Sequence, residues 1–219
     1  LKIGVIPTIS PSLLPLFLPA LIGQFPQVKF IVQEMTTSQI REGLRLRNID
    51  IGVLALPLDD EELNEYPLYK EPFLLYDCTL ENGNQKASLN RLDYSRLCLL
   101  QEGHCLTTQV RKICELSDKF ENNDAHFKIE SGSLGSLLRL TKAIRGLTII
   151  PYLASLDLPQ KSDCRLMEFE APVPVREVGI VTHKFFVKKG LLEAVMELMA
   201  QSVKDHLPQT GREQVMDPL

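Results

Sequence analysis

The first 55 residues alternate between short apolar runs and longer stretches with helical spacing. The apolar runs predict strands over residues 1–6, 28–34 and 49–55, and the stretches between them predict helices over 13–25 and 36–48. A strand–helix–strand–helix–strand order implies a parallel sheet with helices on its faces. The sequence therefore predicts an α/β fold.

The same kind of pattern restarts after residue 77. Residues 56–71 predict a charged connector, and residues 72–76 predict a strand. The elements expected further along are a weak helix at 88–94, strands at 96–100, 126–130, 146–151, 165–169 and 177–182, and helices at 104–114, 131–144 and 190–207. Residues 172–174 are expected to form a linker, and the polar tail from Pro208 is expected to be disordered.

Two successive α/β units predict a bilobed module made of two Rossmann-like lobes. We place lobe I at residues 1–76 plus 177–219 and lobe II at residues 77–176. Modules of this kind bind their ligands in the cleft between the lobes, at the carboxyl ends of strands. Helix N-termini at such a cleft favour small polar or anionic ligands.

Residues 99–114 contain the strongest candidates for reactive side chains. A glycine supplies a sharp turn after an apolar strand, and Leu106, Val110 and Ile113 have the spacing of one helical face. Cys105 would then lie at a helix N-terminus, where free N–H groups and the helix dipole favour a thiolate. A thiolate is the form that attacks peroxide or another disulfide.

Cys114 lies nine residues after Cys105, at the far end of the same predicted helix. A helix of that length rises about 13 Å, whereas a disulfide needs two Cα atoms within roughly 7 Å of each other. A bond between the two sulfurs would therefore require the helix to unwind, and the pair would act as a redox switch. The alternative is that both cysteines are small buried core residues, as most cysteines are.

The other three cysteines are expected to have no chemical role. Cys98 lies in an apolar strand and is expected in the core, whereas Cys78 and Cys164 are expected to be incidental. The sequence has no CxxC and no Cys/His zinc spacing, so we predict no metal site and no cofactor. Five cysteines at irregular spacing favour a reducing, cytoplasmic compartment.

Composition and charge narrow the function classes. Of the 219 residues, 44% are hydrophobic and 24% are charged, which is typical of a soluble globular protein. The net charge of −4 argues against a nucleic-acid surface on this chain. The chain opens on a strand rather than a signal peptide, and no apolar stretch approaches the roughly 18 residues of a membrane span, so we expect no membrane association.

Three motifs together resemble the effector domain of LysR-type transcriptional regulators: Ile3-Gly-Val-Ile-Pro-Thr8, Leu13-Leu-Pro followed by Phe25-Pro26, and Asp50-Ile-Gly-Val-Leu-Ala55. The resemblance spans nearly the whole chain and implies a fold similar to the periplasmic binding proteins. It also implies a homodimer or homotetramer, with residues 13–34 as the expected surface. The family's N-terminal winged helix-turn-helix is absent from this sequence, so contact with DNA and RNA polymerase is expected only through the full-length protein.

A sharper motif, Gln101-Glu-Gly-His-Cys105 followed by Cys114, resembles the peroxide-sensing members of that family. This resemblance implies that hydrogen peroxide oxidises Cys105, that Cys114 then forms the disulfide, and that a thiol reductant restores both. The pocket residues implied by the same matching are Thr8, Thr37, His104, Gln109 and Arg176. Residues 131–136 depart from the family pattern, so Ser131 and Ser133 are not carried over to the pocket.

Each pocket residue also has a structural interpretation. Thr8 and Thr37 could cap the helices that follow them, His104 could only pack beside the cysteine, and Arg176 could form a salt bridge in a linker. The leading hypothesis for the domain is a peroxide sensor that is not an enzyme. The alternatives are a metabolite-binding effector domain with incidental cysteines and a stand-alone thiol peroxidase.

Overall fold

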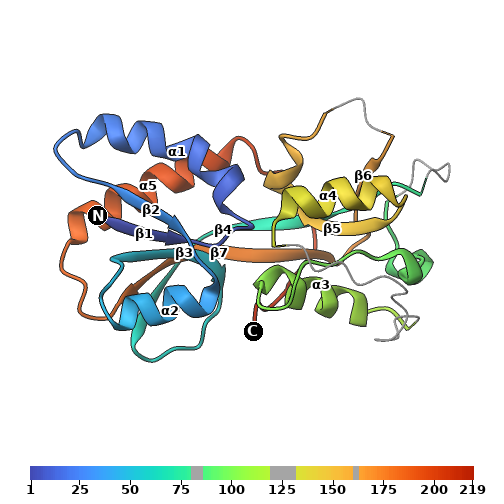
Figure 1. Ribbon diagram of the computed structural model, residues 1–219, viewed down its shortest axis with the longest axis horizontal. Coiled ribbons are helices and arrows are strands. Elements are labelled where there is room, and N and C mark those ends of the chain that lie inside the picture. The colour runs from blue at the N-terminus through green and yellow to red at the C-terminus, as the bar shows by residue number, and fades with distance from the viewer. Residues whose placement is uncertain (80–85, 119–131, 160–162) are drawn as a thin grey trace. The chain divides into compact units, whose positions relative to one another are not determined.

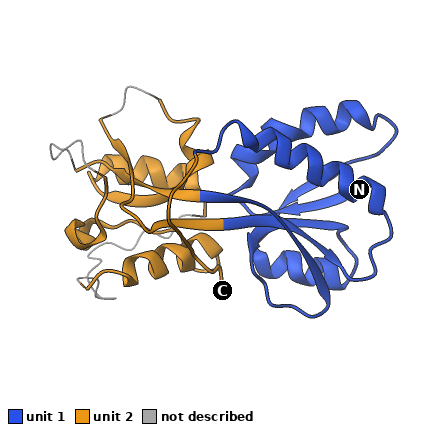
Figure 2. Ribbon diagram, turned by 180° about the vertical axis from the view of Figure 1, so that it is seen from behind, with its two compact units in different colours: residues 1–71, 177–208 blue, residues 72–176, 209–219 orange. Residues whose placement is uncertain are grey.

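The computed structural model describes residues 1–79, 86–118, 132–159 and 163–219. The chain divides into two compact units (Figure 2). Unit 1 comprises residues 1–71 and 177–208, and unit 2 comprises residues 72–176 and 209–219. Each unit combines strands with helices, as the predicted α/β fold requires (Figure 1).

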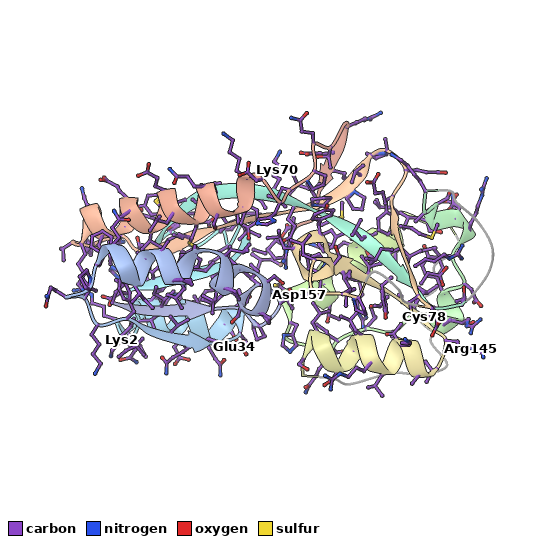
Figure 3. All side chains as sticks on the ribbon, turned by 90° about the horizontal axis from the view of Figure 1, so that it is seen from above. Lys2, Glu34, Lys70, Cys78, Arg145 and Asp157 are labelled. Atoms are coloured by element: carbon purple, nitrogen blue, oxygen red, sulfur yellow. A yellow bond between two sulfur atoms is a disulfide. The ribbon has the colours of Figure 1, made fainter. Side chains whose placement is uncertain are left out.

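Unit 1 is built on a sheet that begins with three parallel strands. Its strands are β1 (Lys2–Val5), β2 (Ile31–Glu34), β3 (Ile51–Leu56), the first part of β4 (Leu63–Asp77) and the later part of β7 (Val173–His183). Its helices are α1 (Ser10–Gln24), α2 (Thr37–Arg45) and α5 (Lys189–Lys204). β1 lies between β2 and β3 and runs parallel to both. Lys2 at the start of β1 and Glu34 at the end of β2 project outward (Figure 3). α1 and α5 pack against each other.

Local sequence explains why these elements form. Every residue of β3 is buried, as its continuous apolar run predicts. α2 begins at a capping box, in which the backbone N–H of Gln39 donates to Oγ1 of Thr36 at 3.3 Å and the backbone N–H of Thr36 donates to Oε1 of Gln39 at 2.9 Å. Ile40 and Leu44 then bury one face of the helix. The predicted order of the first 55 residues is therefore confirmed.

Unit 2 contains the helix that carries Cys105. Its elements are the end of β4 (Leu63–Asp77), β5 (Leu147–Pro151), β6 (Arg165–Glu168), the start of β7 (Val173–His183), β8 (Glu213–Val215), α3 (Cys105–Glu115), α4 (Leu134–Ala143) and the 3₁₀ turns Leu89–Arg91, Tyr94–Arg96 and Tyr152–Ser155. β4 is antiparallel to both β5 and β6, and β8 is parallel to the start of β7. The later part of β7 pairs antiparallel with β3 in unit 1.

Several elements differ from the expected ones. Residues 63–71 are part of β4 rather than a connector. Most residues in this first half of the strand are partly or fully exposed, which accommodates the charged side chains, whereas the second half is buried. The expected strand at 96–100 is reduced to a single bridge between Leu97 and Leu147. The expected linker at 172–174 opens β7. The expected strand at 126–130 lies outside the described residues.

The C-terminal segment departs most from expectation. Residues 209–219 belong to unit 2 rather than to lobe I, and the units divide at residues 71 and 72 instead of 76 and 77. The backbone N–H of Met216 donates to the carbonyl of Val175 at 2.7 Å, and the backbone N–H of Val173 donates to the carbonyl of Arg212 at 2.8 Å. The expectation of a disordered tail is wrong because the polar backbone is paired with β7 and Met216 is buried.

Candidate functional site

Helix α3 begins at Cys105, as the glycine turn and the apolar spacing predict. Gly103 has a φ of +97°, a conformation that glycine adopts without strain. Oγ1 of Thr107 donates to the carbonyl of Leu100 at 3.1 Å, and so fixes the turn to the first turn of the helix. His104 is the N-cap residue, and its side chain does not cap the helix. Cys105 therefore lies where helix N–H groups and the helix dipole favour a thiolate.

Cys105 and Cys114 both lie in this one helix, and neither is part of a disulfide. The side chain of Cys105 is 7% exposed and that of Cys114 is fully buried at 0%. Burial, with a smaller effect from neighbouring Glu115, raises the pKa of Cys114 to about 12. Cys114 is thus a protonated thiol at neutral pH, and the helix holds it about 13 Å from Cys105 by its rise alone.

The buried face of α3 opposes any unwinding. Leu106, Val110 and Ile113 are each at most 2% exposed and belong to the apolar cluster of unit 2 together with Cys114. Burying side chains of this size contributes about 1.5–3 kcal/mol each. A disulfide between Cys105 and Cys114 must therefore replace this packing as well as the helical hydrogen bonds.

A second segment is attached to the same helix. We call residues 212–219, which include β8, the C-terminal strap. Nε2 of Gln109 donates to the carbonyl of Met216 at 2.7 Å, and Lys112 forms an ion pair with Asp217 at 3.6 Å. Lys112 also donates to the carbonyl of Leu219. The strap thus contacts α3 at two side chains between the two cysteines.

Gln109 has a further feature that bears on chemistry. Its side chain is 0% exposed, and its Oε1 atom accepts no hydrogen bond. A buried acceptor left unpaired is costly, at about 1–3 kcal/mol. Gln109 lies one helical turn after Cys105, on the same side of α3. This oxygen is therefore available to a small hydrogen-bond donor.

The remaining pocket candidates are distributed over both units. His104 and Arg176 belong to unit 2, and Thr8 and Thr37 belong to unit 1. Thr8 is buried in the turn after β1, but the N-cap of α1 is Ile9; Thr37 is the first residue of α2, whose N-cap is Thr36. Neither threonine is a helix cap.

Arg176 and the two unassigned serines have distinct positions. Arg176 lies inside strand β7 and is 2% exposed, so it is not part of a linker. Ser133 caps α4 by accepting a hydrogen bond from the backbone N–H of Ser136 at 3.2 Å, and Ser131 lies outside the described residues.

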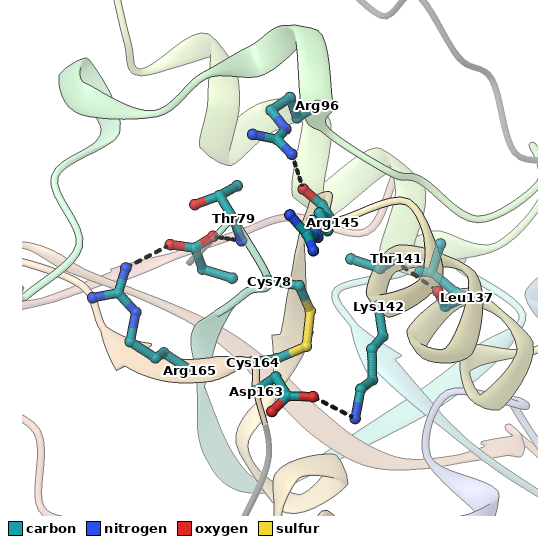
Figure 4. The surroundings of a disulfide bond; sticks show 11 residues. Cys78, Thr79, Arg96, Leu137, Thr141, Lys142, Arg145, Asp163, Cys164 and Arg165 are labelled. Atoms are coloured by element: carbon teal, nitrogen blue, oxygen red, sulfur yellow. Dashed lines mark hydrogen bonds and ion pairs between the residues drawn. A yellow bond between two sulfur atoms is a disulfide. The ribbon is translucent and has the colours of Figure 1, made fainter. Parts of the chain in front are cut away.

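A disulfide joins Cys78 to Cys164, two cysteines that we expected to be incidental (Figure 4). That expectation is wrong for both residues. In the sequence each cysteine adjoins a predicted strand, but nothing local indicates that these two strands pair. The pairing of β4 with β6 brings the two cysteines together across 86 residues of sequence. Cys98 is a buried core residue, as expected.

Among the described residues, no group of three or more His, Cys, Asp or Glu side chains could hold a metal ion. Within the same residues, every helix is too short or too polar to cross a membrane.

Residues 1–204 match the family model of the LysR substrate-binding domain. The chain belongs to this family. The LysR substrate-binding domain accounts for the paired α/β units, and it confirms the periplasmic-binding-protein-like fold expected from the three sequence motifs.

Curated relatives and solved structures of this LysR-domain family refine the comparison. The chain is 29% identical over 209 residues to a Haemophilus influenzae protein named hydrogen peroxide-inducible genes activator, with 94% of this chain and 68% of the relative covered. It is 28% identical to the HTH-type transcriptional regulator EstR of Acinetobacter baylyi, with 91% and 65% covered. The chain thus spans about two thirds of the length of these relatives.

The crystal structure of OxyR from Porphyromonas gingivalis is similar over nearly its whole length. It has a TM-score of 0.86 and 28% sequence identity, with 99% of this chain and 98% of that chain covered. This LysR domain is therefore similar, in fold and in sequence, to OxyR structures.

Proposed function

We propose that this chain is the regulatory domain of a peroxide-sensing LysR-type transcription regulator. The observation that carries the proposal is the placement of two cysteines that form no disulfide at opposite ends of helix α3, with Cys105 at its N-terminus. The similarity to a hydrogen peroxide-inducible activator and to an OxyR structure supports it. Hydrogen peroxide is the ligand, and the protein acts in the cytoplasm.

The proposed chemistry has two balanced steps. The Cys105 thiolate attacks one oxygen of hydrogen peroxide, which breaks the O–O bond, forms a sulfenic acid and releases hydroxide. The Cys114 thiol then displaces water from that sulfenic acid, and the S–S bond forms. A protein or small-molecule dithiol reverses the oxidation by thiol–disulfide exchange. The domain senses the oxidant and does not turn it over as an enzyme.

Gln109 is the pocket residue with the strongest physical support. Its unpaired Oε1 can accept a hydrogen bond from the O–H of peroxide beside Cys105. His104, at the N-cap position, is next to the reacting sulfur in sequence. On the resemblance to peroxide sensors we propose Thr8, Thr37 and Arg176 as further peroxide-binding residues, since their hydroxyl and guanidinium groups can bind peroxide and the departing hydroxide.

Formation of the disulfide is coupled to a change in the conformation of α3. Because Cys114 lies about 13 Å along the helix, the bond forms only when α3 unwinds. Unwinding removes the packing of Ile113 and the hydrogen bond from Gln109 to Met216. The disulfide then makes the unwound state persist, and this change is what the full-length protein transmits to DNA and RNA polymerase.

Self-association fits the surface of unit 1. Helix α1 is apolar on most sides, with Pro15, Pro19 and the half-exposed Ile22 on its outer side. β2 is at the end of the strand order and presents an open edge. We propose that residues 13–34 form the surface of a homodimer or homotetramer. Sedimentation showing only monomer at tens of micromolar, in both redox states, would contradict this.

Thiol trapping tests the chemistry directly. Peroxide treatment followed by alkylation and peptide mass spectrometry should show a Cys105–Cys114 linkage in the native chain. The Cys114→Ser variant should accumulate a sulfenic acid at Cys105 that reacts with dimedone, and the Cys105→Ser variant should give neither product. Cys98→Ser is the matched control, because Cys98 is also a free buried thiol. Peroxide-driven linkage that persists in Cys105→Ser would refute the assignment.

The similarity to EstR supports an alternative, a metabolite-binding effector domain with incidental cysteines. Thermal-shift measurements against a metabolite panel, with the thiols reduced and then oxidised, distinguish the two functions. Stabilisation by a metabolite without any redox effect would favour the alternative. A steady-state assay with a dithiol reductant separates the sensor from a thiol peroxidase, which would turn over peroxide continuously.

A further inference from the structure

The Cys78–Cys164 disulfide extends the pairing of two strands. In the β4–β6 ladder Asp77 is opposite Arg165, so Cys78 and Cys164 occupy the next opposing positions. Their Cα atoms are 4.1 Å apart, and Arg165 forms an ion pair with Asp77 at 3.3 Å beside them (Figure 4). The folded backbone thus places the two sulfurs next to each other.

Further contacts hold this corner of unit 2 in place. The backbone N–H of Cys78 donates to the carbonyl of Gly146 at 2.9 Å, which ties it to the start of β5. Cys78 is 2% exposed and Cys164 is 7% exposed, and both belong to the apolar cluster of the unit. Forming the bond therefore requires no loss of structure.

For Cys105 and Cys114, by contrast, disulfide formation requires a loss of structure. Cys105 and Cys114 share one helix, and a bond between them removes that helix and its packing. A disulfide that the fold favours is harder to reduce than one that the fold opposes, because folding and disulfide formation are thermodynamically linked. The two pairs should therefore differ in their resistance to reductants.

We propose that Cys78 and Cys164 form a second thiol–disulfide couple, which the fold keeps oxidised while Cys105 and Cys114 are thiols. The resting domain thus carries one disulfide and two free switch cysteines at the same time. The comparison with the switch pair rests on the proposed function, whereas the stabilisation of the Cys78–Cys164 bond by the fold does not.

The partner of this couple is a dithiol reductant, and the exchange is balanced. One thiolate of the dithiol attacks Sγ of Cys164, the more exposed sulfur, and the S–S bond breaks with Cys78 leaving as a thiolate that takes up a proton. The second thiolate of the dithiol then attacks the mixed disulfide and releases Cys164. The dithiol becomes a disulfide, and the protein gains two thiols. Burial of both sulfurs makes this exchange slow in the folded domain.

The couple would stabilise unit 2 during the switch. β6 is a strand of only 4 residues, and the disulfide anchors its first end to β4. The bond closes a segment of 86 residues that includes both α3 and α4. A cross-link over so long a loop restricts the unfolded chain strongly. It therefore keeps the rest of the unit folded when α3 unwinds.

Redox titration of the chain tests the proposal. The peroxide-oxidised protein is equilibrated in buffers of reduced and oxidised dithiothreitol, and each cysteine is scored by differential alkylation and mass spectrometry. The Cys78–Cys164 bond should require a ratio of reduced to oxidised dithiothreitol at least about a hundredfold higher than the Cys105–Cys114 bond. Reduction of both pairs at the same ratio, or of Cys78–Cys164 first, would overturn the proposal.

A second arm separates this inference from the peroxide function. The Cys105→Ser/Cys114→Ser double variant contains no switch pair, and its Cys78–Cys164 bond is titrated in buffer and in unfolding concentrations of urea. The native fold should raise the required ratio about a hundredfold over the unfolded chain. An equal ratio in the two conditions would refute the couple, whatever the outcome at Cys105. If no Cys105–Cys114 bond forms in the native chain, the proposed function fails and this arm still decides the inference.

Discussion

The side-chain amide of Gln109 donates a 2.7 Å hydrogen bond to the backbone carbonyl of Met216, 107 residues further along the chain. The donor lies in α3 between Cys105 and Cys114, and the acceptor lies in the C-terminal strap just after β8. Both partners are buried, so the bond is shielded from water and its loss leaves a carbonyl unpaired. The strap and the helix are therefore expected to lose order together.

Replacing Gln109 with methionine keeps the side-chain volume and removes the hydrogen bond. We expect the loss in the free energy of unfolding to be smaller than the roughly 1–3 kcal/mol cost of leaving the Met216 carbonyl buried and unpaired, because the variant also removes the unpaired Oε1 of Gln109. Hydrogen exchange should also rise at residues 213–216. Gln201→Met is the control, since Gln201 is exposed on α5 and bonds only Glu197. Hydrogen exchange at residues 213–216 that is no faster than in Gln201→Met would contradict the role of Gln109.

Weakening the buried face of α3 should favour the disulfide. Ile113→Val removes one methylene from a side chain that is 0% exposed, at a cost of about 0.5–1.5 kcal/mol in the helical state. If α3 is unwound in the oxidised state, the Cys105–Cys114 bond should become about two- to twelvefold more favourable in a dithiothreitol titration. Ile150→Val is the matched control in β5, where both redox states keep the strand. A shift of equal size in both variants would argue that α3 does not unwind.

Cys114 should make the free energy of unfolding decrease at alkaline pH. Burial, and to a lesser extent Glu115, raises its pKa in the folded chain to about 12, from an ordinary value of 9.0. The unfolded chain therefore ionises first, so the contribution of the neutral thiol is fully present below pH 9 and is lost as the pH rises towards 12. Between pH 7 and 10 the native chain should lose about 1.4 kcal/mol more than Cys114→Ala.

The control for this pH dependence is Val110→Ala, which removes buried apolar volume from the same helix and keeps the thiol. Its stability should be lower at every pH, while its loss between pH 7 and 10 should match that of the native chain. The same loss in Cys114→Ala as in the native chain would show that Cys114 ionises as easily when folded as when unfolded.

Gly103 sets the direction in which the chain enters α3. At a φ of +97° an added Cβ is strained even though no atom lies near it, so Gly103→Ala should cost more than about 1 kcal/mol and slow the reaction of Cys105 with peroxide. Gly135→Ala is the control, because Gly135 lies in α4 with open space around it and should change stability by less than about 1 kcal/mol, with a gain expected. Peroxide consumption in stopped flow, with urea unfolding alongside, measures both effects.

The elements that sequence predicts well are those with local causes. The glycine turn at 103 and the helical spacing of Leu106, Val110 and Ile113 place the start of α3 correctly, because the interactions that define them span only a few residues. The two free cysteines of one helix follow from the same local information. Local periodicity also predicted the α/β class.

What sequence could not predict depends on partners far along the chain. The polar tail contains no signal for β8, and it is ordered only because β7 offers an unpaired edge and Gln109 a donor. The charged residues of 63–71 belong to a strand only because half of that strand faces solvent. In the same way, sequence left open whether Thr8 and Thr37 cap the helices after them, and the N-cap residues are their neighbours Ile9 and Thr36.

The two cysteine pairs show the same difference between local and long-range information. The sequence by itself determined that Cys105 and Cys114 lie at opposite ends of one helix and cannot form a disulfide while that helix is intact, because helical rise is set by the backbone alone. Only the tertiary structure decided that Cys78 and Cys164 are partners, because their proximity comes from the β4–β6 register across 86 residues. Strand register is fixed by which apolar faces pack together, and that is a property of the whole unit.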